Sequence, residues 1–281
     1  MSAAELAPVL FGLASAASWG SADFTGGVAT RRSEVYTVIV VSQLVGGLFL
    51  LALAFAFSEP LPSAANLLLG ALAGIFGALG LVALYTGLAQ GQMGVVSPIA
   101  ALVTALLPVV VGIFSAGLPG LLVLLGFGLA FVAVWFLARG DSRAPIRLRE
   151  LKLPVIAGTA FGMFFIIIGH VSSVSILWPL VAARFASVCL IFLYAIARRQ
   201  IHRPGRSQLP LIALTGVLDS GGNAFFALAT RTGRLDIAAV VSSLYPASTV
   251  FLAWLVLKER LVRRQWVGVG LALLALALIA S

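Results

Sequence analysis

Four ionisable residues lie inside long apolar segments of the chain, where charge is costly. They are Asp23, His170, Arg184 and Asp219, and nearly every other charged residue lies in a connection between apolar segments or at a segment end. In a bilayer core a charged side chain costs about 2.5 to 3.5 kcal/mol, so it usually faces a cavity or an oppositely charged partner. These four residues are therefore the first candidates for binding a charged group or exchanging a proton.

Asp219 is the strongest of these candidates. It lies near the middle of its segment, and Asn223 follows one helical turn later, so the two side chains share a helix face. Asp219 is expected to bind a cationic group or a proton, and the alternative is a structural bond, for example to Arg184. Arg184 could hold the carboxylate of a ligand, and the alternative is a side chain that snorkels to the interface.

Asp23 and His170, together with Asp219, are candidates for proton coupling. The charge of a histidine can respond to pH between about 5 and 8, although a lone histidine near an interface is more often a packing residue. Asp23 lies towards one end of its segment, where it either joins a proton relay or pairs with Arg31 or Arg32.

Aromatic rings in the same segments could stack on a ligand. Trp19, Tyr85 and Tyr245 are candidates for this role, and ordinary packing is the alternative.

Three prolines interrupt the backbone hydrogen bonding of their segments. Pro98, Pro108 and Pro246 each leave the carbonyl four residues earlier without its helical donor. Such carbonyls are tolerated at membrane depth only where protein or water surrounds them, so we expect kinks near a binding site at the midplane. The kinks would bring four hydroxyl side chains towards that site: Ser97, Thr104, Ser242 and Ser243. The alternative is a packing kink with no ligand.

The composition excludes a soluble globular protein. Of the 281 residues, 61% are hydrophobic and 10% are charged, and the mean hydropathy is +1.13, whereas soluble domains are about 25% charged. A membrane-spanning helix needs about 20 mostly apolar residues. The sequence predicts an all-α polytopic membrane protein with ten spans: Pro8–Ala29, Val35–Phe57, Asn66–Ala89, Gly94–Ser115, Pro119–Ala138, Leu153–Val174, Leu177–Ala197, Leu209–Thr230, Asp236–Leu257 and Gln265–Ala280.

The ten spans form two repeats of five, residues 1–144 and 145–281. An offset of 142 residues superposes Gly126 and Gly128 on Gly268 and Gly270. Because five is an odd number, two tandem copies must lie in the membrane with opposite orientations. Inverted repeats of this kind are typical of transporters.

The basic residues indicate the orientation of the chain. Apart from Arg184, fifteen Lys and Arg residues lie in alternate connections and two, Arg231 and Arg234, lie in the others. By the positive-inside rule the richer connections are cytoplasmic, which places the protein in the plasma (inner) membrane with both termini outside. The net charge of +9 does not indicate nucleic-acid binding, because the basic residues do not follow one helix face.

The sequence offers few groups for metal, cofactor or enzyme chemistry. One cysteine, Cys189, and two histidines cannot form a closed tetrahedral metal site. The sequence contains no G-x-x-x-x-G-K-[ST], H-E-x-x-H or G-x-S-x-G motif. We therefore expect no metal, no cofactor and no enzyme activity, and we keep an ion or solute channel and an intramembrane enzyme as alternative functions.

Three short stretches resemble EamA-type proteins of the drug/metabolite transporter superfamily. They are Trp19–Phe24, Ser97–Leu102 and Ser243–Pro246, the last followed by Lys258-Glu259-Arg260. The resemblance implies a secondary transporter that exports amino acids or other small metabolites by alternating access through a cavity between its two repeats. The implied partners are a small-molecule substrate and the lipid bilayer, with a homodimer as a further possibility. The sequence departs from the family where Gly117 stands at the first-repeat equivalent of Glu259.

Overall fold

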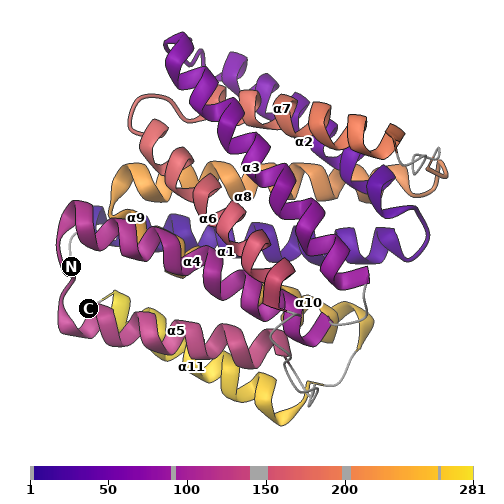
Figure 1. The fold of residues 1–281 in the computed structure, drawn as a ribbon. Coiled ribbons are helices and arrows are strands. Elements are labelled where there is room, and N and C mark those ends of the chain that lie inside the picture. Colours follow the sequence, from indigo (N-terminus) through magenta and orange to yellow (C-terminus); the bar gives the residue numbers. More distant parts are fainter. Residues whose placement is uncertain (1–2, 90–92, 140–150, 198–203, 259–260, 281) are drawn as a thin grey trace.

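A computed structural model describes residues 3–89, 93–139, 151–197, 204–258 and 261–280, and every regular element in these ranges is an α-helix (Figure 1). The helices are α1 (Ala3–Thr30), α2 (Val35–Ala56), α3 (Ala64–Ala89), α4 (Met93–Ala116), α5 (Leu121–Arg139), α6 (Lys152–Val171), α7 (Leu177–Ala197), α8 (Leu209–Thr232), α9 (Leu235–Ser242), α10 (Tyr245–Leu257) and α11 (Arg263–Ile279). The predicted spans agree with these bounds to within a few residues, except that the ninth span consists of two helices, α9 and α10.

The helices cross the molecule in alternating directions (Figure 1). One end of the bundle, here called the basic end, carries Arg31, Arg32, Arg139, Lys152 and Lys258 at helix ends. The opposite end, here called the terminal end, holds the two chain termini (Figure 1). The alternation explains why the basic residues of alternate connections gather at one end.

Seven of the helical segments in the described ranges are long and apolar enough to cross a membrane. They are α2, α3, α4, α6, α7, α8 and the α9–α10 pair, and α5 is a shorter apolar helix. α1 and α11 run beside them and complete ten crossings (Figure 1). Many large apolar side chains are exposed on the outside of the bundle, among them Phe57, Leu68 and Phe114. An apolar outer surface of this kind fits a lipid environment and not water.

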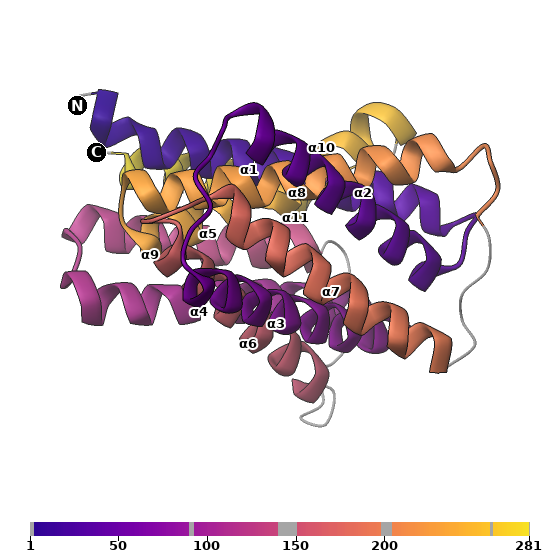
Figure 2. The same cartoon turned by 90° about the horizontal axis from the view of Figure 1, so that it is seen from above.

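Helices of the first repeat pack mainly against helices of the second. The helix pairs in contact are α1 with α8, α9 and α10; α2 with α7 and α8; α3 with α6 and α7; α4 with α6 and α9; and α5 with α11. Helices α1 and α8 run along each other in both views (Figures 1 and 2). The counterparts in the two repeats are α1 and α6, α2 and α7, α3 and α8, α4 and the α9–α10 pair, and α5 and α11. Exchanging each helix for its counterpart reproduces the same set of contacting pairs. The two repeats are therefore related by an approximate two-fold axis.

The contact between α5 and α11 repeats this symmetry at single residues. A Cβ placed on Gly126 would meet Ile279 and the Ala275 carbonyl, and a Cβ on Gly268 would meet Leu137 and the Ala133 carbonyl. The equivalent positions are Gly126 and Gly268, Ala133 and Ala275, and Leu137 and Ile279, and the two members of each pair lie 142 residues apart. The two glycines are thus reciprocal contact points.

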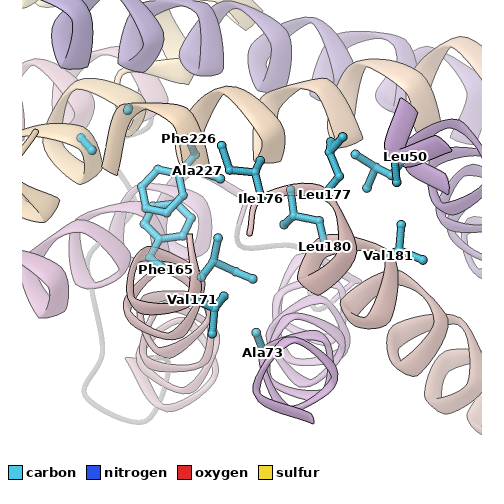
Figure 3. Packing of buried hydrophobic residues seen from close by; sticks show 14 of the residues in the cluster. Leu50, Ala73, Phe165, Val171, Ile176, Leu177, Leu180, Val181, Phe226 and Ala227 are labelled. Atoms are coloured by element: carbon cyan, nitrogen blue, oxygen red, sulfur yellow. The ribbon is translucent and has the colours of Figure 1, made fainter. Parts of the chain in front are cut away.

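The apolar core lies between the two repeats. A cluster that includes Leu50, Phe165, Leu180 and Phe226 joins α2, α6, α7 and α8 (Figure 3). Because both repeats contribute to this core, neither forms a separate compact body.

Candidate functional site

A polar cluster joins three helices inside the bundle: Gln43 from α2, Arg184 from α7 and Asp219 from α8. Arg184 Nη1 lies 2.6 Å from Asp219 Oδ2 and donates to Gln43 Oε1 at 2.5 Å. Gln43 Nε2 donates to the same Asp219 oxygen at 3.2 Å. The ion pair belongs to the second repeat, and the first repeat contributes the amide that contacts both charges.

Glycines allow these three helices to approach closely enough to form the cluster. A Cβ on Gly46 would collide with Ser220 Oγ and the Gly216 carbonyl of α8, and a Cβ on Gly47 would lie 3.2 Å from Arg184 Cβ. Small residues at helix contacts in membranes permit such close backbone packing. The Gly46-Gly47 pair therefore positions Gln43, which lies one turn earlier on the same helix.

The cluster leaves groups that can contact a ligand. The side chain of Arg184 is 7% exposed and that of Asp219 is 32% exposed. Arg184 Nη2 is buried and has no hydrogen-bond partner among the described residues. A buried donor without a partner carries a free-energy cost that an anionic oxygen would remove. Asn223, one turn after Asp219 on α8, is also largely buried.

An aromatic group made by one residue each of α1, α6 and α8 lies near this cluster, next to Gly222 of α8. Trp19 stacks on Phe165 with ring centroids 5.2 Å apart and an interplanar angle of 8°, and Phe165 and Phe226 lie 4.3 Å apart. Gly222 leaves room for the indole, because a Cβ there would overlap the Trp19 ring. Figure 3 shows Phe165 and Phe226 close together between the repeats.

The ninth span is interrupted where Pro246 predicts a kink. α9 ends at Ser242, and α10 begins at Tyr245 with Pro246 in its first turn. The two hydroxyls at the interruption are buried: Ser242 Oγ donates to the Gly12 carbonyl at 3.5 Å, and Ser243 Oγ donates to the Val240 carbonyl at 2.7 Å. Half-buried Tyr245 lies next to α1, since a Cβ on Gly20 would overlap its carbonyl.

The fourth span differs from the ninth, because α4 continues from Met93 to Ala116 without interruption. It contains both Pro98 and Pro108. The buried Thr104 hydroxyl donates to the Ala100 carbonyl of its own helix at 2.7 Å. The side chains of Tyr85, Ser97 and Pro98 lie outside the described part of the chain.

The other two proton-coupling candidates lie apart from the polar cluster. His170 is exposed in the last turn of α6, at the terminal end (Figure 1). Asp23 is exposed in a cleft between α1 and α10 of about 370 Å³, which Thr249 and Arg31 also line. Asp23 forms no hydrogen bond or ion pair within the described ranges, so the expected pair with Arg31 or Arg32 is not seen there.

At the terminal end, Glu59 joins the two repeats. Its carboxylate oxygens accept the backbone N–H groups of Ile176 at 2.7 Å and Leu177 at 2.8 Å, where α7 begins. Its carbonyl accepts the indole N–H of Trp178 at 2.8 Å. A carboxylate at a helix N-terminus satisfies free donors and complements the helix dipole, so Glu59 holds the α2–α3 connection onto α7.

A second contact at the terminal end also joins the repeats, and here the charged group is a cation, the guanidinium of Arg234. Arg234 donates to the carbonyls of Ala116 at 3.0 Å and Gly117 at 2.6 Å, where α4 ends. Gly117 has φ +78°, the left-handed conformation common after a helix. Arg234 also pairs with the fully buried Asp236 at 2.7 Å, and these hydrogen bonds raise the pKa of the guanidinium above its ordinary value.

The sequence analysis missed several of these residues for identifiable reasons. Gln43, Phe165 and Phe226 are uncharged residues inside apolar segments, and the search for intramembrane charge passed over Gln43. Glu59 and Arg234 lie in connections, where charged side chains are normally solvated.

With this geometry described, comparison with known proteins is informative. The model of the EamA-like transporter family matches residues 6–139 and again residues 150–281. The chain belongs to the EamA-like transporter family. The two matches are the two five-helix repeats seen in the structure, and EamA-like proteins are generally transporters and not enzymes.

Solved structures support the fold of this EamA-like protein. A crystal structure of a protein superposes with a TM-score of 0.77, covering 96% of this chain and 95% of that chain at 15% identity. At this identity the likeness shows the fold alone. No curated protein matches the sequence significantly.

Proposed function

We propose that this secondary transporter exports amino acids or other small metabolites by alternating access, with its substrate bound between the two repeats at the Gln43–Arg184–Asp219 cluster. The repeats of this proposal are residues 1–144 and 145–281. The protein lies in the plasma (inner) membrane with its basic end in the cytoplasm, in line with the positive-inside rule.

The observation that carries the proposal is the incomplete pairing inside the cluster. Arg184 Nη2 is buried without a partner in the described ranges, while Asp219 is partly exposed. A substrate carboxylate would pair with the free guanidinium nitrogen, and a substrate ammonium would pair with the carboxylate. Both groups occur together in an amino acid.

Residues around the cluster complete the proposed site. Asn223 supplies an amide one turn from Asp219, and Trp19 supplies an aromatic face. The other substrate contacts that we propose are Tyr85, Ser97, Thr104, Ser242, Ser243 and Tyr245. Asp23, Asp219 and His170 are the proposed proton-coupling groups.

The test is solute exchange in liposomes that contain only the purified protein. Saturable flux and counter-exchange of amino acids indicate a carrier, whereas ohmic current would indicate a channel and chemical turnover an enzyme. We expect Asp219→Asn to abolish exchange while the protein still inserts and folds. Unchanged flux in this variant would remove Asp219 from the site.

A second pair of variants tests how Arg184 acts. Arg184→Lys keeps the charge but cannot form the two parallel bonds of a guanidinium, so we expect at least a tenfold loss of affinity for a carboxylate-bearing substrate. Cys189→Ser changes an exposed residue of the same helix and is expected to leave the affinity unchanged. Normal affinity in Arg184→Lys would contradict carboxylate recognition at this residue.

A further inference from the structure

The cleft at Asp23 contains a carboxylate that the fold leaves without a partner. Asp23 lies in the membrane-spanning helix α1, one turn after Trp19, and makes no hydrogen bond or ion pair within the described ranges. A charged residue at such a position is costly unless it has a partner. This cost is not offset by any contact in the described part of the protein.

The cleft has the size and lining of a site for a small molecule. Its volume of about 370 Å³ is at the lower end of the range for ligand pockets, about 300 to 1,000 Å³. Its walls are mostly apolar, and polar groups are supplied by Asp23, Thr30, Arg31 and Thr249. The apolar lining residues are Phe24, Gly27, Val28, Ala253 and Leu257.

The charge of the cleft favours a cation near Asp23. The lining of the cleft contains one carboxylate, that of Asp23, and one cationic side chain, that of Arg31. Arg31 lies eight residues further along, about 12 Å on an α-helix. The negative potential is therefore greatest at the Asp23 side of the cleft.

The lining selects an organic cation over a metal ion. Calcium and magnesium take six or more oxygen ligands, and the described residues contain no group of three or more His, Cys, Asp or Glu side chains that could hold a metal. One carboxylate with a neighbouring hydroxyl and apolar walls instead fits an alkylammonium group, which has up to three N–H donors and an apolar stem.

We propose that the α1–α10 cleft binds the ammonium group of a small organic solute, with Asp23 as its anionic partner. The cleft is lined by the C-terminal parts of α1 and α10, one helix from each repeat, near the basic end. In this proposal it is a docking site from which the solute passes to the polar cluster. The inference rests on the proposed function and names the class of solute: one that carries an amine.

The experiment places a thiol inside the cleft. Gly27 lines it, and a Cβ there has no neighbour within 4 Å, so Gly27→Cys in a Cys189→Ser background adds a reporter without a collision. Labelling rates are measured with a cationic, trimethylammonium-bearing methanethiosulfonate and with an anionic, sulfonate-bearing one. Each rate is divided by that of the same reagent with a free thiol.

We expect the cation-to-anion rate ratio to fall about tenfold on Asp23→Asn, since a carboxylate close to the reporter thiol attracts a cation and repels an anion. Asp23→Glu is expected to keep the ratio. Glu34→Gln, which removes an exposed carboxylate at the start of α2 that does not line the cleft, is the matched control. n-Propylammonium is expected to slow the labelling when Asp23 is present, and neutral propionamide is not. An unchanged ratio in Asp23→Asn, or equal protection by the two compounds, would overturn the proposal.

This test does not depend on transport. Labelling is measured on the folded protein without a gradient, so absent exchange in liposomes would refute the proposed function and leave the labelling result in place. Normal exchange without cation selectivity at Gly27→Cys would refute the docking site alone.

Discussion

The two ends of the bundle join the repeats in different ways. At the terminal end, Glu59 caps the start of α7 and Arg234 caps the end of α4, and each contact crosses from one repeat to the other. At the basic end, α1 and α10 leave a cleft in which Asp23 has no partner in the described ranges. Within the described ranges, charged contacts join the repeats at the terminal end, and a cleft lies between α1 and α10 near the basic end.

This difference indicates how the repeats could move. The polar cluster lies between the two ends. In the proposed mechanism a solute at Asp219 leaves towards the basic end by way of the cleft, and it leaves at the terminal end only when the two caps separate. Helix caps suit this role, because water can replace their hydrogen bonds once they open.

Arg234→Met is expected to be the most damaging single change at the terminal end. It leaves the fully buried Asp236 carboxylate without its cation and the last carbonyls of α4 without their donor. Breaking a buried ion pair in this way costs about 3 kcal/mol, measured as the free energy of unfolding in detergent. Arg231→Met, an exposed arginine at the same end, should change stability little, and equal stability of both variants would contradict the role of Arg234.

Glu59→Gln should weaken the second cap less severely. The amide keeps one acceptor oxygen but loses the charge-assisted bonds to the start of α7, a loss of about 1 to 2 kcal/mol. We expect faster amide hydrogen exchange at Ile176 and Leu177, and no change at the basic end. If exchange at these two amides stays the same, Glu59 does not hold the repeats together.

Asp23→Asn at the open end should not lower stability, because Asp23 stabilises nothing in the described fold. Asp219→Asn is the informative comparison, since it breaks the ion pair with Arg184 and should lower the unfolding temperature. A loss of stability in Asp23→Asn as large as that in Asp219→Asn would mean that Asp23 has a structural partner.

The smallest expected effect is that of pH on the Arg234 cap. The hydrogen bonds with Asp236 raise the pKa of Arg234 above its ordinary value, so the contribution of the contact is complete at neutral pH and is lost only in strongly alkaline solution. The stability difference between the wild type and Arg234→Met should therefore be the same at pH 6 and pH 9. A difference that shrinks between these two values would show that another group controls the contact.

The fold was largely accessible from the sequence, because length and apolar composition determine membrane spans directly. The duplication could also be predicted from the sequence, because Gly126 and Gly268 lie at equivalent positions. In the structure these two glycines occupy reciprocal contacts. Pro246 marked the place where the ninth span is interrupted. In α4, Pro98 and Pro108 carry the same signal, yet the helix continues, so proline alone does not decide whether a span breaks.

The candidate site was harder to predict from the sequence, because the partner of each polar side chain depends on which helices pack together. Asp219 and Arg184 stood out as intramembrane charges, and their pairing was one of two alternatives. Gln43 joins them from the other repeat, 141 residues away from Arg184, and no local pattern indicates that contact. Glu59 and Arg234 are likewise ordinary loop residues until the fold brings helix ends next to them.

A cross-link at the terminal end tests directly whether the repeats must separate there for a solute to cross. Pro60 and Val174, exposed residues on either side of the Glu59 contact, are replaced by cysteine in Cys189→Ser and joined by a short, cleavable bis-thiosulfonate linker. Flux into liposomes is then measured before linking, after linking and after cleavage. The account predicts that linking abolishes flux and cleavage restores it; full flux with the linker in place would contradict it.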